Sequence, residues 1–348
     1  MKTLRRCAIL HNFSQTTTLE AALEHFAFVQ ADPIRSPARA QDLILRHRVK
    51  NYRAGDLEKH YPKLNLEEDF LYAYGFMPRN TWQLLHPRTQ GKLSKFEKQI
   101  LEIVQTSGPM HPKVLEKQLG KKSVRNNWGG FSQAGTQALE VLQHRGLLRV
   151  ARRENGIRVY EQATLFEEKL SKEQRLRALI LLVANILAPV SQRTLRAQMQ
   201  RYKRLGNPQV ALEALLKSGE LRQENCDGVS YLWPNVQVED GELVKTVKLL
   251  APFDPLVWDR ARFEHFWGWQ YRFEAYTPKA KRVRGYYAMP LLYGEEMIGW
   301  ANVSTAHDKF EVQIGFVGKE PKEKTFQHEL EEEIQRMKVF LALPPKPR

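Results

Sequence analysis

A carboxamide and a carboxylate lie two residues apart in the segment FVQADPIRSPARAQDLILRHRV, residues 28–49. They are Gln30 and Asp32, and a proline follows at once. A carboxylate can act as a general base or stabilise a developing positive charge. However, Asp-Pro is also a common turn dipeptide, in which Asp32 could pair with Arg35 or Arg39. Taken by itself, the segment favours the turn interpretation over the catalytic one.

Two helices must position this pair. Pro33 disfavours helical geometry at Asp32, so we predict that the first helix ends there. Ser36 and Pro37 are typical of an N-cap and a first helical residue, which predicts the start of the second helix. Basic residues recur along that second helix at a spacing that would form a phosphate-binding face. They are Arg35, Arg39, Arg46, Lys50 and Arg53.

The composition indicates a polyanionic partner. The chain has 348 residues, with 54 Lys and Arg against 39 Asp and Glu, a formal net charge of +15. Such an excess favours nucleic acid or an anionic membrane as partner. The most apolar segment, residues 178–188, is shorter than the roughly 20 residues of a membrane span. The first residues do not resemble a signal peptide, and two isolated cysteines suit a reducing compartment. We therefore expect a cytoplasmic protein that does not contact membranes.

One pattern occurs twice in the chain, at residues 138–161 and 211–233. Each copy predicts a helix that ends at a glycine, Gly146 or Gly219, where a left-handed residue is favourable. Each then predicts a β-hairpin, whose turn is Asn155-Gly156 in one copy and an Asp-Gly pair in the other. Two further helices precede each copy, at 92–108 and 111–119 and at 171–187 and 191–202. This order predicts two winged helices.

A winged helix places its third helix in the DNA major groove and its hairpin along the backbone. The first predicted hairpin carries four arginines that could contact phosphate. They are Arg149, Arg152, Arg153 and Arg158. Winged helices also serve as protein–protein spacers, and this alternative stays open, mainly for the less basic second copy.

The remainder of the chain predicts two further parts. Residues 1–91 are predicted to be helical, as a degenerate winged helix that carries Gln30 and Asp32. Residues 274–317 predict antiparallel strands, and 322–343 a closing helix. The predicted fold class is therefore α+β, with tandem winged-helix domains and a C-terminal antiparallel β-rich domain. We expect domains at 1–91, 92–165, 166–236 and 237–348.

The chain resembles the AlkZ/YcaQ-type DNA glycosylases along nearly its whole length. The resemblance is carried by VQAD (29–32), by WGGFSQAGTQALEVLQHRGLLRVARRENGIRVYE (128–161), and by LLAPFDPLVWDRARFEHFWGWQYRFEAYTPKAKRVRGYYAMPLL (249–292). In that family the catalytic motif is Gln-x-Gln or Gln-x-Asp, and this chain has the Gln-x-Asp form. Some members carry a His-Glu pair near the position of Tyr74.

The resemblance implies a DNA repair enzyme that acts on alkylation damage by base excision. Its expected reaction is hydrolysis of the N-glycosidic bond of N7-alkylated purines, with unhooking of interstrand crosslinks as a further hypothesis. Asp32 would orient or deprotonate the attacking water, and Gln30 would position it. The expected partner is double-stranded DNA, bound by a monomer associated with the nucleoid. In the C-terminal domain, Lys281, Arg282 and Arg284 are further candidates for phosphate contact.

Cofactors are not expected. No HxxxH or CxxC pattern indicates a metal site, and no glycine-rich loop indicates nucleotide binding. Nothing marks a lysine as a Schiff-base nucleophile, so we expect a monofunctional enzyme. The acidic residues Asp254 and Asp259 of PFDPLVWDR are interpreted as partners of buried ion pairs rather than as catalytic groups.

Two other functions are alternatives to the glycosylase. A winged-helix transcription regulator without catalytic activity would explain the charge and the hairpins equally well. It would not explain Gln-x-Asp at an arginine-rich corner. A nuclease would need an acidic metal-binding cluster, which the sequence does not suggest.

Overall fold

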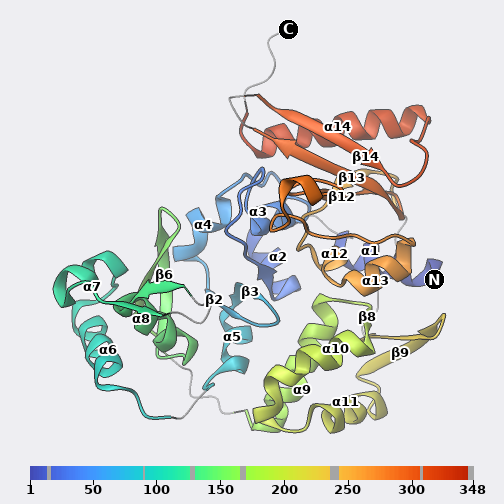
Figure 1. Ribbon diagram of the computed structural model, residues 1–348. Coiled ribbons are helices and arrows are strands. Elements are labelled where there is room, and N and C mark those ends of the chain that lie inside the picture. Colours follow the sequence, from blue (N-terminus) through green and yellow to red (C-terminus); the bar gives the residue numbers. More distant parts are fainter. Residues whose placement is uncertain are drawn as a thin grey trace. The chain divides into compact units, whose positions relative to one another are not determined.

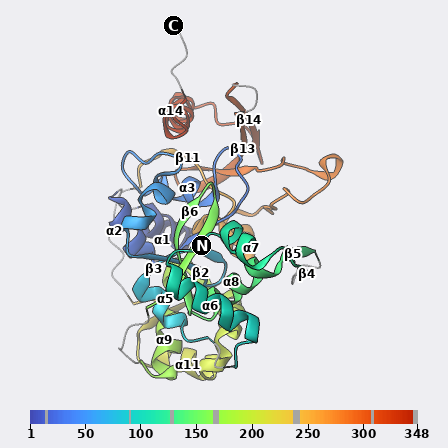
Figure 2. The same ribbon diagram turned by 90° about the vertical axis from the view of Figure 1, so that its left-hand side faces the viewer.

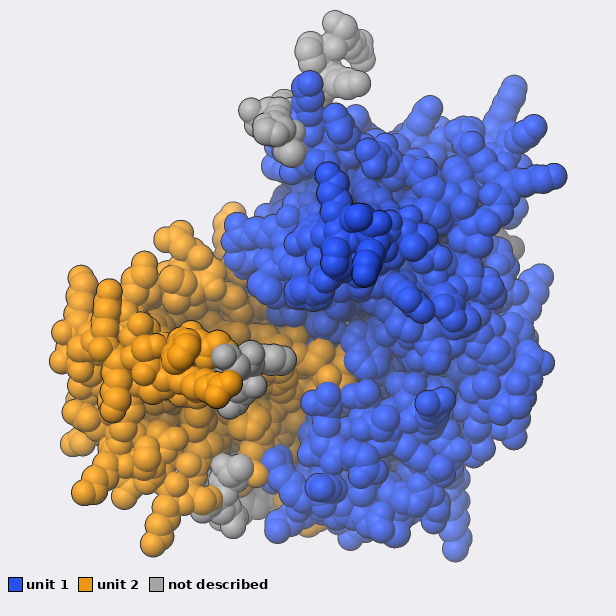
Figure 3. All heavy atoms as spheres, in the orientation of Figure 1, with its two compact units in different colours: residues 1–57, 172–348 blue, residues 58–171 orange. Residues whose placement is uncertain are grey.

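The computed structural model describes residues 1–13, 17–88, 91–125, 130–164, 170–235, 243–305 and 309–343. The chain divides into two compact units, coloured separately in Figure 3. Unit 1 comprises residues 1–57 and 172–348, and unit 2 comprises residues 58–171. The predicted four-domain division stays a prediction, and its boundaries near 165 and 236 lie outside the described residues.

Unit 2 combines helices with three antiparallel hairpins, β2–β3, β4–β5 and β6–β7 (Figure 1). After α4 (Asp56–His60), which crosses the unit boundary, its elements are the 3-10 helix η1 (Tyr61–Lys63), β2 (Leu66–Phe70), β3 (Tyr74–Pro78), α5 (Arg79–Leu85), α6 (Lys95–Ser107), α7 (Pro112–Leu119), β4 (Ser123–Arg125), β5 (Phe131–Gln133), α8 (Ala134–His144), β6 (Leu148–Glu154) and β7 (Ile157–Gln162). The predicted order of three helices and a hairpin is present in α6, α7, α8 and β6–β7. The hairpins β2–β3 and β4–β5 were not predicted.

The residue types of the turn correctly predicted the position of the β6–β7 hairpin. Asn155 and Gly156 form its turn with positive φ angles of 50° and 83°, as an Asn-Gly hairpin requires. Gly146 ends α8 with φ 77°. A Cβ atom at Gly146 would lie 2.4 Å from His86 Nδ1, so only glycine fits there. Both predictions are confirmed.

Unit 1 begins with α1 (Lys2–Phe13), α2 (Leu19–Phe26), the short strand β1 (Val29–Gln30) and α3 (Ala40–Leu45). The second part of the chain in this unit adds α9 (Lys172–Ile186), β8 (Val190–Ser191), α10 (Gln192–Met199), η2 (Gln200–Leu205), α11 (Pro208–Lys217), β9 (Leu221–Cys226) and β10 (Val229–Pro234). β10 pairs antiparallel with both β8 and β9. The β9–β10 turn falls on Asp227 and Gly228, with φ 48° and 79°, and the repeat predicted it.

The C-terminal part of unit 1 is a four-stranded antiparallel sheet in the order β11-β12-β13-β14. Its elements are β11 (Val247–Leu249), α12 (Pro255–Trp258), α13 (Arg260–Trp267), η3 (Lys279–Lys281), β12 (Met289–Tyr293), β13 (Glu296–Ser304), β14 (Glu311–Phe316) and α14 (Lys324–Phe340). The predicted closing helix is α14 (Figure 1). It packs against β11. The predicted meander begins later than expected, because residues 274–288 are a loop and the first strand starts at Met289.

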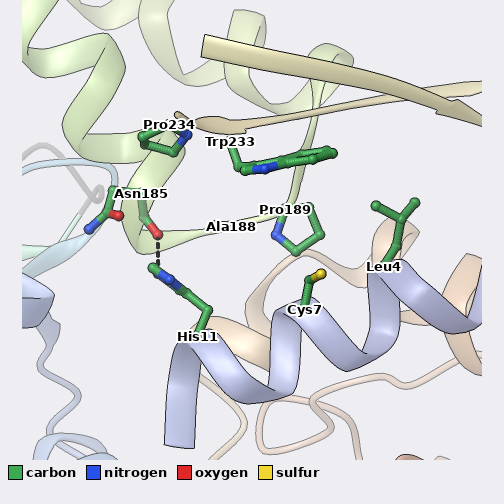
Figure 4. Close-up of a pocket in the computed structure, with 8 residues that line it drawn as sticks. All are labelled: Leu4, Cys7, His11, Asn185, Ala188, Pro189, Trp233 and Pro234. Carbon is green, nitrogen blue, oxygen red and sulfur yellow. Dashed lines mark hydrogen bonds between the residues drawn. The ribbon is translucent and has the colours of Figure 1, made fainter. Parts of the chain in front are cut away.

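A small cavity lies in unit 1 between α1, the end of α9 and β10 (Figure 4). It is lined by Leu4, Cys7, His11, Asn185, Ala188, Pro189, Trp233 and Pro234, and its volume is ≈ 20 Å³. His11 Nε2 lies 2.7 Å from the Asn185 carbonyl oxygen at its edge. A space of this size holds about one water molecule, so this cavity does not admit a nucleobase.

None of the helices within the described residues is long and apolar enough to cross a membrane.

Candidate active site

The corner that carries Gln30 and Asp32 starts earlier than the sequence suggested. Helix α2 ends at Phe26, and Ala27 follows in the left-handed conformation with φ 54°. The Ala27 N–H donates to the Leu23 carbonyl oxygen at 2.8 Å, which closes the helix. Phe28 and Val29 are then buried in extended backbone. The prediction that Pro33 ends this helix is therefore wrong, because the chain has already left the helix six residues before Asp32.

The second helix begins later than predicted. Helix α3 starts at Ala40 with Arg39 as its N-cap, and Ser36-Pro37 lies in the irregular segment before it. All six residues of α3 are buried, so this short helix belongs to the core and presents no basic face. Arg35 precedes the helix and Arg46 follows it. The predicted helical stripe of arginines is corrected accordingly.

A buried arginine fixes both sides of the corner. Arg48 has no exposed side-chain surface. Its guanidinium lies 4.9 Å from the centre of the Phe26 ring, at the end of α2. Nη1 donates to the Ile44 carbonyl oxygen of α3 at 2.8 Å, and Nη2 donates to Asn12 Oδ1 of α1 at 3.0 Å. The elements before and after Gln30 and Asp32 are thus bonded to one side chain.

The partner of Arg48 comes from the PFDPLVWDR segment. Arg48 donates to both carboxylate oxygens of Asp254, at 2.8 and 3.0 Å. Asp254 also caps α12 by accepting from the Leu256 N–H at 3.0 Å. In the same region Arg262 donates to the carbonyl oxygens of Leu187 and Pro189. The Arg48–Asp254 contact is the buried ion pair that the sequence suggested for Asp254, although its partner belongs to the N-terminal segment.

The Asp32 carboxylate has no counter-charge among the described residues. Its Oδ1 accepts from the Ile34 N–H at 2.9 Å. Within the part of the chain that the structure describes, Asp32 forms no ion pair with Arg35 or Arg39. Burial raises the pKa of Asp32, and the Ile34 hydrogen bond opposes this only in part. A half-buried carboxylate with a raised pKa and no ion pair is typical of a functional site.

Two buried polar atoms near this carboxylate have no hydrogen-bond partner in the described structure. One is the amide oxygen of Gln30, and the other is the hydroxyl of Tyr287. Burial raises the pKa of Tyr287 well above its usual value, and the charge of Asp32 raises it further. The sequence offered no signal for the burial of this tyrosine, because burial depends on the tertiary fold.

The candidate phosphate contacts near the corner have different surroundings. Arg35 and Lys50 are exposed, and Arg39 is half-buried. Arg46 has only 4% of its side chain exposed and pairs with the fully buried Glu333 of α14. It also donates to the Leu249 carbonyl oxygen at 3.1 Å. A phosphate contact from Arg46 would have to break this ion pair, and the role of Arg46 in DNA binding stays a prediction.

The arginines of the β6–β7 hairpin are bound to acidic residues within unit 2. Arg149 donates to Glu67 at 2.8 Å, and Arg153 pairs with Glu68. Burial raises the pKa of Glu67 to about 7, against the charge of Arg149. Arg158 stacks over Tyr74, whose hydroxyl donates to the same Glu68 at 2.9 Å.

Arg152 is more exposed than the other three and contacts Glu154 of its own strand. Much of the positive charge of this hairpin is therefore neutralised by the glutamates. A role of Arg149, Arg152, Arg153 and Arg158 in DNA binding stays a prediction.

The loop 274–288 carries the remaining basic candidates and extends away from the β11–β14 sheet (Figure 2). Its base is closed by Glu274, whose carboxylate accepts from the N–H groups of Val283, Arg284 and Gly285. Lys281 is exposed on this loop. Arg282 donates to the Thr277 carbonyl oxygen at 2.8 Å. The loop therefore presents cations on an ordered backbone.

Arg284 differs from the other two cations of the loop. Its guanidinium lies between the rings of Trp269 and Trp300, 5.0 and 5.3 Å from their centres. Phosphate contact by Lys281, Arg282 and Arg284 stays a prediction, and this stacking makes it least direct for Arg284.

Neither of two further features supplies a separate chemical site. Among the described residues, no group of three or more His, Cys, Asp or Glu side chains could hold a metal ion. An open hollow of ≈ 470 Å³ lies in unit 2 beside α6 and α8, lined in part by Glu97, Lys122 and Gln137. Neither this hollow nor the small cavity of unit 1 is lined by Gln30 or Asp32.

Comparison with known proteins decides the family. The family model described as DNA glycosylase AlkZ-like matches residues 23–340. The chain belongs to this family. The matched range includes Gln30, Asp32 and Tyr287, and it spans both units.

A solved structure has the same fold. The Streptomyces sahachiroi DNA glycosylase AlkZ superposes with a TM-score of 0.67 over 99% of this chain and 98% of that chain, at 12% sequence identity. At this identity the likeness concerns the fold, which mixes helices with several antiparallel sheets. Membership of the AlkZ-like family assigns the protein to the DNA glycosylases, and DNA is the substrate that this membership implies.

Proposed function

We propose that this AlkZ-like protein is a monofunctional DNA glycosylase that hydrolyses the N-glycosidic bond of N7-alkylated purines. The observation that carries the proposal is the Asp32 carboxylate, which is half-buried and has no ion pair among the described residues. Two residues earlier in the chain, the amide oxygen of Gln30 is buried and has no donor in the part of the chain that the structure describes. A carboxylate and an amide oxygen can together accept both hydrogens of one water molecule.

An N7-alkylated purine needs little acid catalysis. The base is cationic, so it can leave as a neutral molecule without being protonated. The sugar then develops positive charge, which the Asp32 carboxylate would stabilise while it takes a proton from the attacking water. Gln30 would orient the same water. These roles need neither a metal ion nor a lysine nucleophile.

The two segments of three helices and a hairpin would act as winged helices that bind the duplex, and the loop 274–288 would add contacts to phosphate. Base flipping into a pocket is the usual route of glycosylases. A site open to the duplex would also accept bulky adducts, so we include interstrand crosslinks in the proposal as a second substrate class to be tested.

The test is a duplex oligonucleotide with a single N7-methylguanine, incubated with the protein and then heated with alkali. Strand cleavage at the modified position and none in the unmodified duplex are expected. Treatment with borohydride should trap no covalent complex. If the protein bound the duplex but made no abasic sites, the regulator interpretation would replace the proposal. A duplex crosslinked through two N7-alkylguanines tests the second substrate class separately.

The rate should depend on pH through Asp32. Because burial raises the pKa of this group, the rate should fall by about tenfold per pH unit below a midpoint above 3.8, the usual value for aspartate. Above the midpoint the rate should be flat, since no general acid is needed. Single-turnover rates, corrected for spontaneous depurination, would measure this. A rate that increases toward low pH would contradict the base role of Asp32.

The salt dependence of DNA binding should distinguish basic residues that contact phosphate from basic residues that form ion pairs within the protein. Lys281→Ala should reduce the slope of log K against log salt by about 0.9, the effect of one lost phosphate contact. Arg46→Met should leave the slope unchanged and lower the free energy of unfolding by about 2 kcal/mol, because it removes hydrogen bonds to a buried charge. Fluorescence anisotropy at several salt concentrations and urea unfolding measure both. If Arg46→Met reduced the slope and Lys281→Ala did not, Arg46 would be a DNA contact.

A further inference from the structure

The positive charge of the second segment of three helices and a hairpin is concentrated on α10 and η2 (Figure 1). Between Glu173 and Glu213 the sequence has no acidic residue. The same stretch has seven basic residues, two on α9 and five on α10 and η2. These five are Arg193, Arg196, Arg201, Lys203 and Arg204. An uninterrupted run of one charge sign indicates a partner of the opposite sign.

The other elements of this segment that a winged helix would use for DNA carry no such charge. The hairpin β9–β10 and the residue before it have three acidic residues, Glu220, Glu224 and Asp227, against one basic residue, Arg222. The third helix, α11, carries one residue of each sign. A net negative hairpin is repelled by phosphates, so a contact with DNA in this segment requires another surface.

The basic residues of α10 and η2 lie on an exposed side of these helices. On the other side Leu195, Met199 and Tyr202 are buried, where α10 and η2 pack against α9. Four basic residues are exposed and form no ion pair within the described part of the chain. We call these four the α10–η2 surface, and they are Arg193, Arg196, Arg201 and Lys203.

Protein stability does not explain this arrangement. Arg193 lies in the first turn of α10, where the helix dipole disfavours a positive charge, and this turn has no acidic residue. Arg196 follows three residues later, and like charges at this spacing repel each other. The surface therefore costs stability in the free protein, and a bound polyanion would remove that cost.

We propose that the α10–η2 surface binds the phosphate backbone of duplex DNA, so that this segment contacts DNA through its second helix and not through its hairpin. This inference takes from the proposed function only that DNA is the partner. The distance from Arg193 to Arg201 along the helix axis is about 12 Å, which matches about three or four phosphates spaced by roughly 3.4 Å along the duplex. In helix-turn-helix proteins, too, the helix before the recognition helix crosses the backbone.

The chemistry of the surface favours a backbone over other anionic partners. Within α10 and η2, which the structure describes in full, no large apolar side chain is exposed, so nothing on this surface would enter a membrane. Phosphate contacts carry no sequence information. Such contacts suit an enzyme that must act on damage in any sequence.

The test combines Arg193→Gln, Arg196→Gln and Arg201→Gln in the full chain. The slope of log K against log salt for an unmodified duplex should fall by about 2.7, which is 0.9 for each of three lost phosphate contacts. Each single substitution should lower it by about 0.9. The loss should be equal for two duplexes of different sequence, and the thermal midpoint at low salt should stay the same or rise, because repulsion is removed. Fluorescence anisotropy and thermal unfolding measure these effects.

The matched control removes the same charge from another surface. Lys319→Gln, Lys322→Gln and Lys324→Gln change exposed lysines that are interspersed with Glu320 and Glu323, and they should leave the slope unchanged. If both triple variants lowered the slope equally, net charge would explain the result and the inference would fail. It would also fail if the first variant kept the slope of the wild type, and the proposed function would stand as long as the wild type released N7-methylguanine. A wild type that bound the duplex but released no base would overturn the proposed function and leave this inference intact.

Discussion

Asp32→Asn should reduce the single-turnover rate on N7-methylguanine duplex by about 10³-fold, within the usual range for loss of a general base. The amide keeps the size of the side chain, and it can still accept the Ile34 N–H bond. It can neither take a proton from water nor stabilise positive charge on the sugar. DNA affinity should be unchanged or higher, because a negative charge near the phosphates is removed. Alkali-induced strand cleavage and fluorescence anisotropy measure the two effects.

The same variant should be more stable than the wild type at neutral pH. The pKa of Asp32 is raised by burial in the folded protein, so the folded state binds its proton more tightly than the unfolded state does. Stability therefore falls as pH rises from the unfolded pKa through the folded pKa, and this loss is complete at neutral pH. Asparagine has no such loss. A rise in the thermal midpoint together with a loss of rate would mark Asp32 as retained for chemistry.

Asp42→Asn provides the matched control. Asp42 is also a buried carboxylate whose pKa is raised by burial, but it accepts from the Tyr52 hydroxyl at 2.7 Å and the Gly55 N–H at 3.1 Å. Asp42→Asn should keep its rate within tenfold of the wild type, because this carboxylate is used for hydrogen bonds inside the protein that asparagine can still accept. If Asp42→Asn and Asp32→Asn lost activity equally, a general disturbance of the corner would explain the result better than a base at Asp32.

Local turn chemistry explains which parts of the fold could be predicted. Asn155-Gly156 and Asp227-Gly228 form their hairpins because two adjacent residues supply the positive φ angles. Gly146 and Gly219 end their helices with φ 77° and 75° for the same reason. Such signals act within a few residues and hardly depend on the rest of the chain. The repeat was visible because it consists of these signals.

The corner at Asp32 could not be predicted from such local signals. Ser36-Pro37 has the residue types of a helix start, but α3 begins at Ala40. The position of α3 is set by burial of all its residues and by Arg48, whose partners lie in other elements. Similarly, helical spacing placed Arg46 on an exposed face, while Glu333 of α14 binds it inside the protein. Long-range ion pairs of this kind cannot be recognised from a local sequence pattern.

Only part of the candidate site could be predicted, because local patterns reveal residues that are neighbours in the sequence and not those that come together in the fold. Gln30 and Asp32 are neighbours in sequence, so the motif could be read directly, with the family resemblance deciding between turn and catalysis. Tyr287 comes from the far end of the chain and was quoted only within a segment rich in basic residues. Its burial and its hydroxyl without a partner among the described residues are properties of the tertiary fold that the sequence does not contain.

We expect Arg48 to contribute more to the stability of the site than Gln30 or Asp32 does. Arg48→Met should lower the free energy of unfolding of unit 1 by about 3–5 kcal/mol, because it leaves the fully buried Asp254 carboxylate without its counter-charge. It also removes the donors to Ile44 and Asn12. The exposed pair of Arg177 and Glu220 is the comparison, and Arg177→Met should cost less than about 1 kcal/mol. Urea unfolding followed by tryptophan fluorescence measures both.

A double variant separates the ion pair from packing. Arg48→Met with Asp254→Asn removes both charges, while asparagine still caps α12 at the Leu256 N–H. This variant should recover about 2 kcal/mol of the loss, since no buried charge is left unpaired. If it were as unstable as Arg48→Met alone, the loss would come from packing against the Phe13 and Phe26 rings, whose centres lie 4.7 and 4.9 Å from the Arg48 guanidinium, rather than from charge. At a temperature where the double variant is folded, a rate within tenfold of the wild type would show that Arg48 acts on the corner only by holding α2 and α3 in place.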